Sequence, residues 1–163
     1  MDEIKFWEIV QRAHEQSSGD MDHKCEVIKT IISKLSRDDA IGFARLFDLM
    51  MARAYDWRLW GAAYVIHGGC GDDSFSDFCS ALISRGRRAF ESALADPDSL
   101  AEEDFDEDSW FYEGFQYAVT DGVAAAVGSV PKREVSFPSE PSGEEWAEDD
   151  VYDLYPLLSK KFA

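Results

Sequence analysis

The chain has few cysteines and no long apolar run, and both shortages narrow the class of protein. Its 163 residues include three cysteines, Cys25, Cys70 and Cys79, which form no CxxC pair. An odd number of scattered thiols is unlike the disulfide framework of a small secreted domain. No apolar stretch approaches the roughly 18 residues of a membrane span, and the N-terminus lacks the basic start and apolar run of a signal peptide. We therefore expect a reduced, cytoplasmic protein that does not enter a membrane.

Positive charge is also scarce, above all in the second half. The chain has 33 acidic and 16 basic residues, for a formal net charge of -17. Residues 1–90 carry 14 acids and 12 bases, whereas residues 91–163 carry 19 acids and 4 bases. Such a field repels nucleic-acid phosphates and anionic lipid heads, so we expect neither as a partner. A basic protein partner is favoured, although an acidic surface also serves solubility alone.

Apolar residues recur at intervals of three and four through the first two thirds of the chain, which is typical of amphipathic helices. Asp2 and Ser36 precede two of these runs as N-caps. The run from Trp60 to His67 is apolar nearly all round, which predicts a helix at the centre of the fold. The predicted fold class is mainly α, a single-domain multi-helix bundle. Its helices are expected over about 3–16, 21–35, 37–54, 60–67, 74–94 with an interruption at Gly86, and 109–127 with an interruption or softening at Gly122.

The chain changes character after Gly128. Prolines at 131, 138 and 141 predict an extended, turn-rich segment, within which residues 134–137 have the pattern of a short strand. Apolar residues from Val151 to Leu158 predict a short C-terminal helix, and Lys160 and Lys161 suit the negative end of its dipole. We therefore divide the chain into a helical core domain, 1–128, and an acidic segment with a short helix, 129–163, packed on the core.

A junction between two predicted helices, from His67 to Asp73, holds the candidate catalytic residues. Cys70 before a helix start is expected to have a lowered pKa, with His67 as its base and Asp72 or Asp73 as a further base or ligand. The alternative roles are structural: a helix cap for the aspartates and packing for Cys70 and His67. A zinc site that also uses His23 and Cys25 has poor specificity, so no metal is expected. The glycines lack the Lys-Ser/Thr pair of a phosphate-binding loop, so no cofactor is expected.

Acidic and aromatic residues near the end of the chain are the candidate partner-binding residues. Tryptophan is favoured both in cores and at binding hot spots, and Trp146 among carboxylates either pins the tail to the domain or anchors a cationic partner. The basic cluster of Arg85, Arg87 and Arg88 is expected to pair with the acidic C-terminal half. The candidate partner-binding residues are Asp104, Asp106, Asp108, Trp110, Trp146, Asp149 and Asp150.

Several of these segments together resemble a known bacterial family, domain of unknown function 4240. The segments are Phe6-Trp7, Ala52 to Tyr64, Gly68-Gly69-Cys70 with Asp72, Asp73 and Phe75, Leu82 to Arg87, Ala93 to Asp98, and the Gly-Glu-Glu-Trp stretch near the end. The resemblance implies a mainly helical, cytoplasmic domain and brings no reaction or substrate. It also implies asparagine at the position of His67 in many relatives, which argues against an essential histidine.

Three functions follow as hypotheses. The leading one is a non-enzymatic, acidic protein-interaction module, for example an immunity protein that neutralises a basic toxin. The second is a hydrolase-type or metal-dependent enzyme that uses the junction from Gly68 to Asp73. The third is a regulatory or structural domain.

Overall fold

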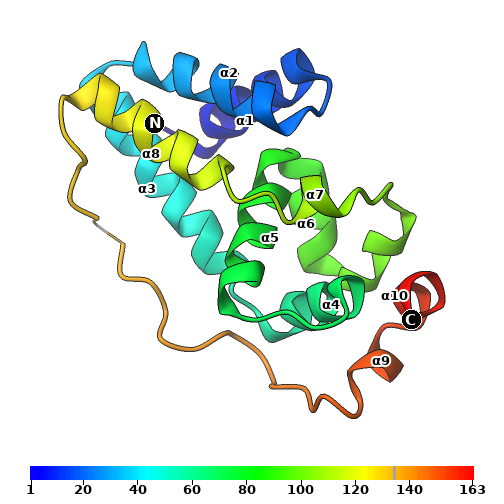
Figure 1. Cartoon of the computed structure of the whole chain (residues 1–163). Coiled ribbons are helices and arrows are strands. Elements are labelled where there is room, and N and C mark those ends of the chain that lie inside the picture. Colours follow the sequence, from blue (N-terminus) through cyan, green and yellow to red (C-terminus); the bar gives the residue numbers. More distant parts are fainter. Residues whose placement is uncertain (134) are drawn as a thin grey trace.

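The computed structural model describes residues 1–133 and 135–163, and over these ranges the chain is a bundle of helices (Figure 1). The mainly α prediction is confirmed, since no strand is present in the described residues. The predicted strand at 134–137 includes one residue outside the described ranges, and its other three residues form no strand. The helices are α1 (Glu3–Ser17), α2 (Met21–Ser33), α3 (Arg37–Ala54), α4 (Trp57–His67), α5 (Asp72–Ser84), α6 (Arg87–Ala95), the 3-10 helix η1 (Pro97–Glu102), α7 (Glu107–Trp110), α8 (Phe115–Val127), α9 (Val151–Leu154) and α10 (Pro156–Phe162).

Local caps fix several helix starts where the sequence predicts them. The Asp2 carboxylate accepts a hydrogen bond from the amide of Lys5, 2.8 Å away, and the Ser36 hydroxyl accepts one from the amide of Asp39. These bonds satisfy amides that a helix N-terminus otherwise leaves unpaired. At the other end of a helix, Gly86 adopts φ 103°, which separates α5 from α6 as predicted.

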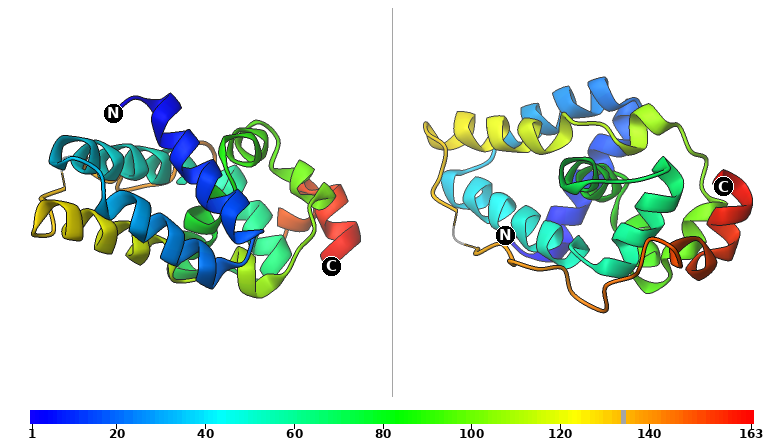
Figure 2. Two further views of the ribbon diagram at one scale, coloured as in Figure 1. Left: turned by 90° about the horizontal axis from the view of Figure 1, so that it is seen from above. Right: turned by 60° about the horizontal axis from the view of Figure 1, so that its bottom comes forward.

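The central helix is α5, and the expectation that the apolar helix α4 occupies the centre is wrong. Eight residues of α5 are buried, including Phe75, Phe78 and Leu82, and the helix lies in the middle of the bundle (Figure 2). By contrast, α4 contacts α5 and also the C-terminal helices α9 and α10, and the Tyr155 and Trp146 side chains of the tail lie against its Gly61. The helices that contact α5 are α1, α3, α4, α6, α7 and α8.

One cation lies deep in this core. The Lys24 side chain on α2 is 1% exposed, and its ammonium donates hydrogen bonds to the carbonyl and hydroxyl oxygens of Ser84, at 3.2 and 3.1 Å. No carboxylate pairs with it among the described residues. Burial, followed by the charge of Arg85, lowers the pKa of Lys24 to about 7.

The tail after α8 runs along one side of the bundle, past α3, to α9 and α10 at the opposite end (Figure 1). Ser142 forms a parallel bridge with Asp56, just before α4. The Trp146 indole donates a 2.6 Å hydrogen bond to the carbonyl of Trp57, and the Tyr155 hydroxyl donates one to the carbonyl of Arg58. These contacts confirm that Trp146 pins the acidic tail to the core.

The tail packs closely against α4 because position 61 is glycine. A Cβ at Gly61 would lie 2.4 Å from the Tyr155 hydroxyl and 2.9 Å from the Trp146 indole nitrogen. We therefore expect Gly61→Ala to displace both rings, to lower stability by roughly 1–3 kcal/mol and to expose the tail to limited proteolysis. Gly71→Ala is the matched control, since a Cβ there meets nothing within 4 Å. Equal protection of the tail in both variants would contradict this packing.

None of the helices in the described ranges combines the length and the apolar character needed to cross a bilayer.

Candidate functional site

The glycine junction is a tight corner between α4 and α5. Gly68 ends α4 in the left-handed conformation at φ 69°, and the amide of Gly69 donates back to the carbonyl of Tyr64. The Trp60 indole donates a 2.8 Å hydrogen bond to the carbonyl of Cys70. The corner is therefore held by backbone geometry and by one tryptophan from α4.

Cys70 is poorly suited to act as a nucleophile. Its thiol is half-buried, and burial, aided by the charge of Asp77, raises the pKa of Cys70 to about 12. The prediction of a lowered pKa is wrong because desolvation and a nearby carboxylate both oppose the thiolate. The thiol remains protonated at neutral pH.

His67 faces a different set of residues from Cys70. Its Nδ1 lies 2.8 Å from a carboxylate oxygen of Glu107, at ion-pair distance but without hydrogen-bond alignment, and its ring stacks on Phe111 at 4.3 Å. Among the described contacts, none joins His67 to Cys70. The structure therefore does not bring His67 and Cys70 together as the predicted catalytic pair. His67 instead connects α4 to α7 through its contact with Glu107.

Asp72 and Asp73 lie in the first turn of α5, where the positive end of the helix dipole stabilises their negative charges. Neither is the N-cap, because the helix begins after Gly71 and no side chain caps it. Both are exposed at the rim of a cavity of about 290 Å³ whose walls include Tyr55 and Phe75. Within the described ranges, no three His, Cys, Asp or Glu side chains come together to hold a metal ion.

Asp77 was absent from the sequence-predicted site, yet it is the carboxylate most affected by its surroundings here. Burial, followed by the charge of Glu113, raises the pKa of Asp77 to about 6, and Gln116 donates a 3.3 Å hydrogen bond to it. Asp73 lies four residues earlier on the same helix and adds a smaller repulsion. That spacing is the sequence signal that points to Asp77.

The acidic residues of the C-terminal half lie mostly at the surface. Asp104, Asp108, Asp149 and Asp150 are exposed and form no ion pair among the described residues. Asp106 is also exposed and accepts hydrogen bonds from the amide of Asp108 and the hydroxyl of Ser109, which caps α7. In the described part of the chain, two ion pairs use carboxylates from residues 91–163: Glu91 with Arg53 and Glu107 with His67.

Trp110 requires a correction, because its side chain is fully buried and lies out of reach of a partner. Its indole donates a 3.1 Å hydrogen bond to the carbonyl of Asp104, and its ring packs at 4.4 Å from that of Phe105. The Arg85 guanidinium lies 3.8 Å from the Trp110 ring centroid. Trp110 therefore attaches the acidic loop around Asp104 and Phe105 to the core from the inside of the protein.

The basic cluster does not act as one unit. Arg85 is near the acidic half as predicted, since Glu103 and Asp106 partly oppose the lowering of its pKa by burial. Arg87, by contrast, lies 3.9 Å from Glu3 at the start of α1. The prediction that the whole cluster pairs with the C-terminal half is wrong because α6 turns Arg87 toward α1.

Comparison with known proteins identifies the family. A family model described as "Protein of unknown function (DUF4240)" matches residues 1–123, which is well over half of the chain. The match ends within α8, so the Gly-Glu-Glu-Trp stretch at 143–146 lies outside it. Neither the curated proteins nor the solved structures gave a match. The match of this family model to residues 1–123 thus places the chain in the DUF4240 family.

Proposed function

We propose that this protein is a non-enzymatic interaction module that binds a basic protein partner; an immunity protein bound to a basic toxin is one example of that class. The observation that carries the proposal is that the carboxylates at 104, 108, 149 and 150 are exposed and have no ion-pair partner among residues 1–133 and 135–163. The nearby Lys161 does not neutralise these carboxylates, because its ammonium donates hydrogen bonds to the backbone carbonyls of Ala101 and Glu103.

Two acidic runs, residues 104–108 and residues 149–150, lie next to the C-terminal helices α9 and α10. Asp98 caps the start of α10 by accepting hydrogen bonds from the amides of Leu157 and Leu158. Lys161, near the end of α10, ties that end to the loop that leads into residues 104–108. The second run, at 149–150, directly precedes α9, which contacts α10. Both runs therefore border the α9–α10 region.

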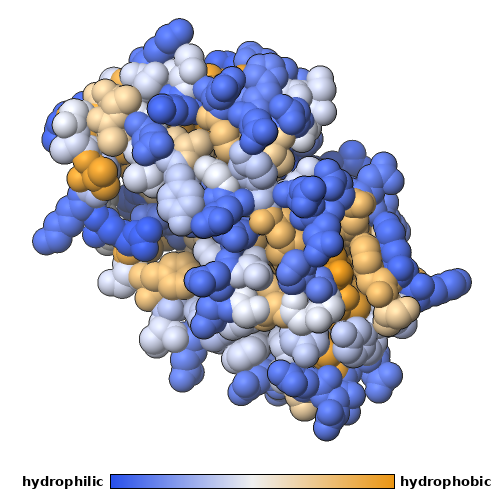
Figure 3. Space-filling view, in the orientation of Figure 1, coloured by the Kyte–Doolittle hydropathy of each residue, from blue (hydrophilic) through white to orange (hydrophobic). Residues whose placement is uncertain are grey.

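Apolar side chains are exposed on α9 and α10, next to these runs in the chain or in contact with their neighbours. Leu154 is 56% and Leu157 51% exposed. Figure 3 shows apolar side chains among strongly hydrophilic ones on this side of the molecule. We call Asp104, Asp108, Asp149, Asp150, Leu154 and Leu157 the acidic–apolar surface. Apolar anchors with a charged rim suit a basic, amphipathic partner, because the apolar contacts supply affinity and the charges supply steering.

A synthetic helical peptide with leucines on one face and lysines on both flanks tests this proposal. We expect it to bind the protein saturably, and we expect the triple variant Asp104→Lys, Asp108→Lys, Asp149→Lys to weaken binding by about tenfold or more. Isothermal titration calorimetry measures both affinities.

Two controls make the result specific. The triple variant Glu8→Lys, Glu26→Lys, Asp121→Lys changes net charge equally at exposed sites on α1, α2 and α8, and we expect it to change affinity by about twofold at most. A peptide of the same composition with its leucines scattered is expected to bind more weakly. Equal loss in both triple variants would reduce the effect to net charge and contradict the proposal.

A further inference from the structure

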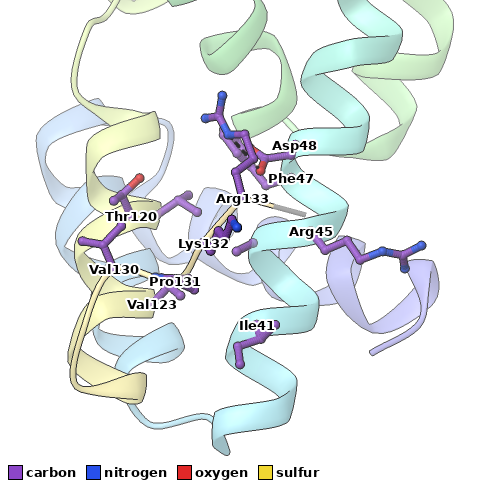
Figure 4. A pocket seen from close by; sticks show the side chains of 12 residues that line it. Ile41, Arg45, Phe47, Asp48, Thr120, Val123, Val130, Pro131, Lys132 and Arg133 are labelled. Atoms are coloured by element: carbon purple, nitrogen blue, oxygen red, sulfur yellow. Dashed lines mark ion pairs between the residues drawn. The ribbon is translucent and has the colours of Figure 1, made fainter. Parts of the chain in front are cut away.

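A second site lies at the opposite end of the molecule from the acidic–apolar surface. A cavity of about 220 Å³ lies between α3 and α8, and the chain segment after α8 forms a further side of its wall (Figure 4). Apolar side chains form most of its wall: Ile41, Ala44 and Phe47 from α3, Val119 and Val123 from α8, and Val130 and Pro131 from the segment.

Cations border this cavity although the chain is strongly acidic. Lys132 and Arg133 lie over it between α3 and α8, whereas the Arg45 side chain extends away from it (Figure 4). Within the described part of the chain, the lining includes one carboxylate, that of Asp48, which lies 3.3 Å from the Arg133 guanidinium. Burial raises the pKa of Asp48 and the charge of Arg133 opposes that rise, so the carboxylate is partly desolvated, whereas the Arg133 side chain is 65% exposed.

The acidic runs do not cancel this local charge. They lie around α7, α9 and α10, at the other end of the bundle (Figure 1). Charges separated by more than about 8 Å are largely screened at physiological ionic strength. Among the described charged groups, Lys132, Arg133 and Asp48 therefore lie nearest to a ligand in the cavity, and the net charge of these three groups is positive.

We propose that this cavity binds a small carboxylate whose apolar body is about the size of one aromatic ring. A dry protein cavity of about 150 Å³ accommodates benzene, so about 220 Å³ accommodates a ring with a short substituent. The apolar wall takes the ring, and the carboxylate meets the Lys132 ammonium at the rim. The carboxylate also competes with Asp48 for the guanidinium of Arg133. This site is independent of the proposed partner surface.

Fluorine NMR titration with 4-fluorophenylacetate tests the site. We expect saturable binding that the variant Lys132→Gln, Arg133→Gln weakens at least about fivefold, since it removes two charges from a segment outside the helices. Asp48→Asn is expected to tighten binding about two- to threefold, because it removes the competing carboxylate. A gain of affinity cannot result from unfolding, so this variant keeps the test valid if another folds poorly.

Three controls define the result. The neutral analogue 4-fluorophenylacetamide is expected to bind at least about fivefold more weakly, and Ala44→Phe, which fills the cavity, is expected to abolish binding while circular dichroism stays unchanged. Lys160→Gln, an exposed lysine on α10, is expected to leave affinity unchanged. Absence of saturable binding, equal binding of acid and amide, or insensitivity to the Lys132 and Arg133 changes would overturn the proposal.

Discussion

Replacement of Trp110 by alanine is expected to lower the free energy of unfolding by roughly 3–5 kcal/mol, a large part of the stability of a single domain. The side chain is fully buried, so its removal leaves a cavity under the acidic loop. The change also removes the hydrogen bond to the carbonyl of Asp104 and the platform beneath the Arg85 guanidinium. Urea denaturation followed by far-ultraviolet circular dichroism measures the loss.

The neighbouring variant Asp108→Lys provides the comparison, because Asp108 is exposed in the same short helix. We expect it to change stability by no more than about 0.5 kcal/mol. If Trp110 were a surface anchor for a partner, its removal would leave stability as unaffected as that of the Asp108 variant. That outcome would refute its placement in the core.

Replacement of Lys24 by methionine is expected to raise stability at pH 7 by roughly 1–3 kcal/mol. The ammonium is buried without a carboxylate partner, and methionine fills a similar volume without a charge. The gain is smaller than the full cost of burying a charge, because the Ser84 carbonyl loses its hydrogen-bond donor. A buried lysine therefore costs stability here, and an apolar side chain recovers part of it.

The pH dependence identifies the cause. The pKa of Lys24 falls from 10.5 in the unfolded chain to about 7 in the folded one, so between these values the unfolded state holds the extra proton. Stability from this group is lowest below about pH 7 and rises as the pH increases toward 10.5. The advantage of Lys24→Met should therefore shrink over that window. A methionine variant that is less stable at pH 7, or that keeps the same advantage at pH 10, would contradict a buried, uncompensated lysine.

Features that depend on near neighbours in the chain were predictable. Asp2 and Ser36 cap helices through amides three residues away, and Gly86 separates two helices through its own backbone angle. The prediction of one helix from 109 to 127 is wrong because the break in it depends on a contact with a distant part of the chain. It breaks before Phe115, and the Tyr112 hydroxyl in the break donates a hydrogen bond to Asp22 on α2, 90 residues away in the chain.

The site residues show the same division. The exposure of Asp104 and Asp149 follows from a run of charges that no core accepts. The raised pKa of Cys70 depends on burial and on Asp77, neither of which is apparent from its place before a helix start. The burial of Lys24 depends on Ser84, which lies 60 residues later in the chain. The expectation for α4 fails because the distant tail packs against this helix, so that α5 and not α4 occupies the centre.

The salt dependence of binding to the basic amphipathic peptide tests the acidic–apolar surface most directly. If its carboxylates face a cationic partner, affinity should fall steadily as sodium chloride rises from low to several-fold physiological concentration. The triple lysine variant at positions 104, 108 and 149 should lose most of that dependence while keeping its fold. An affinity that stays constant across the salt range would contradict the account.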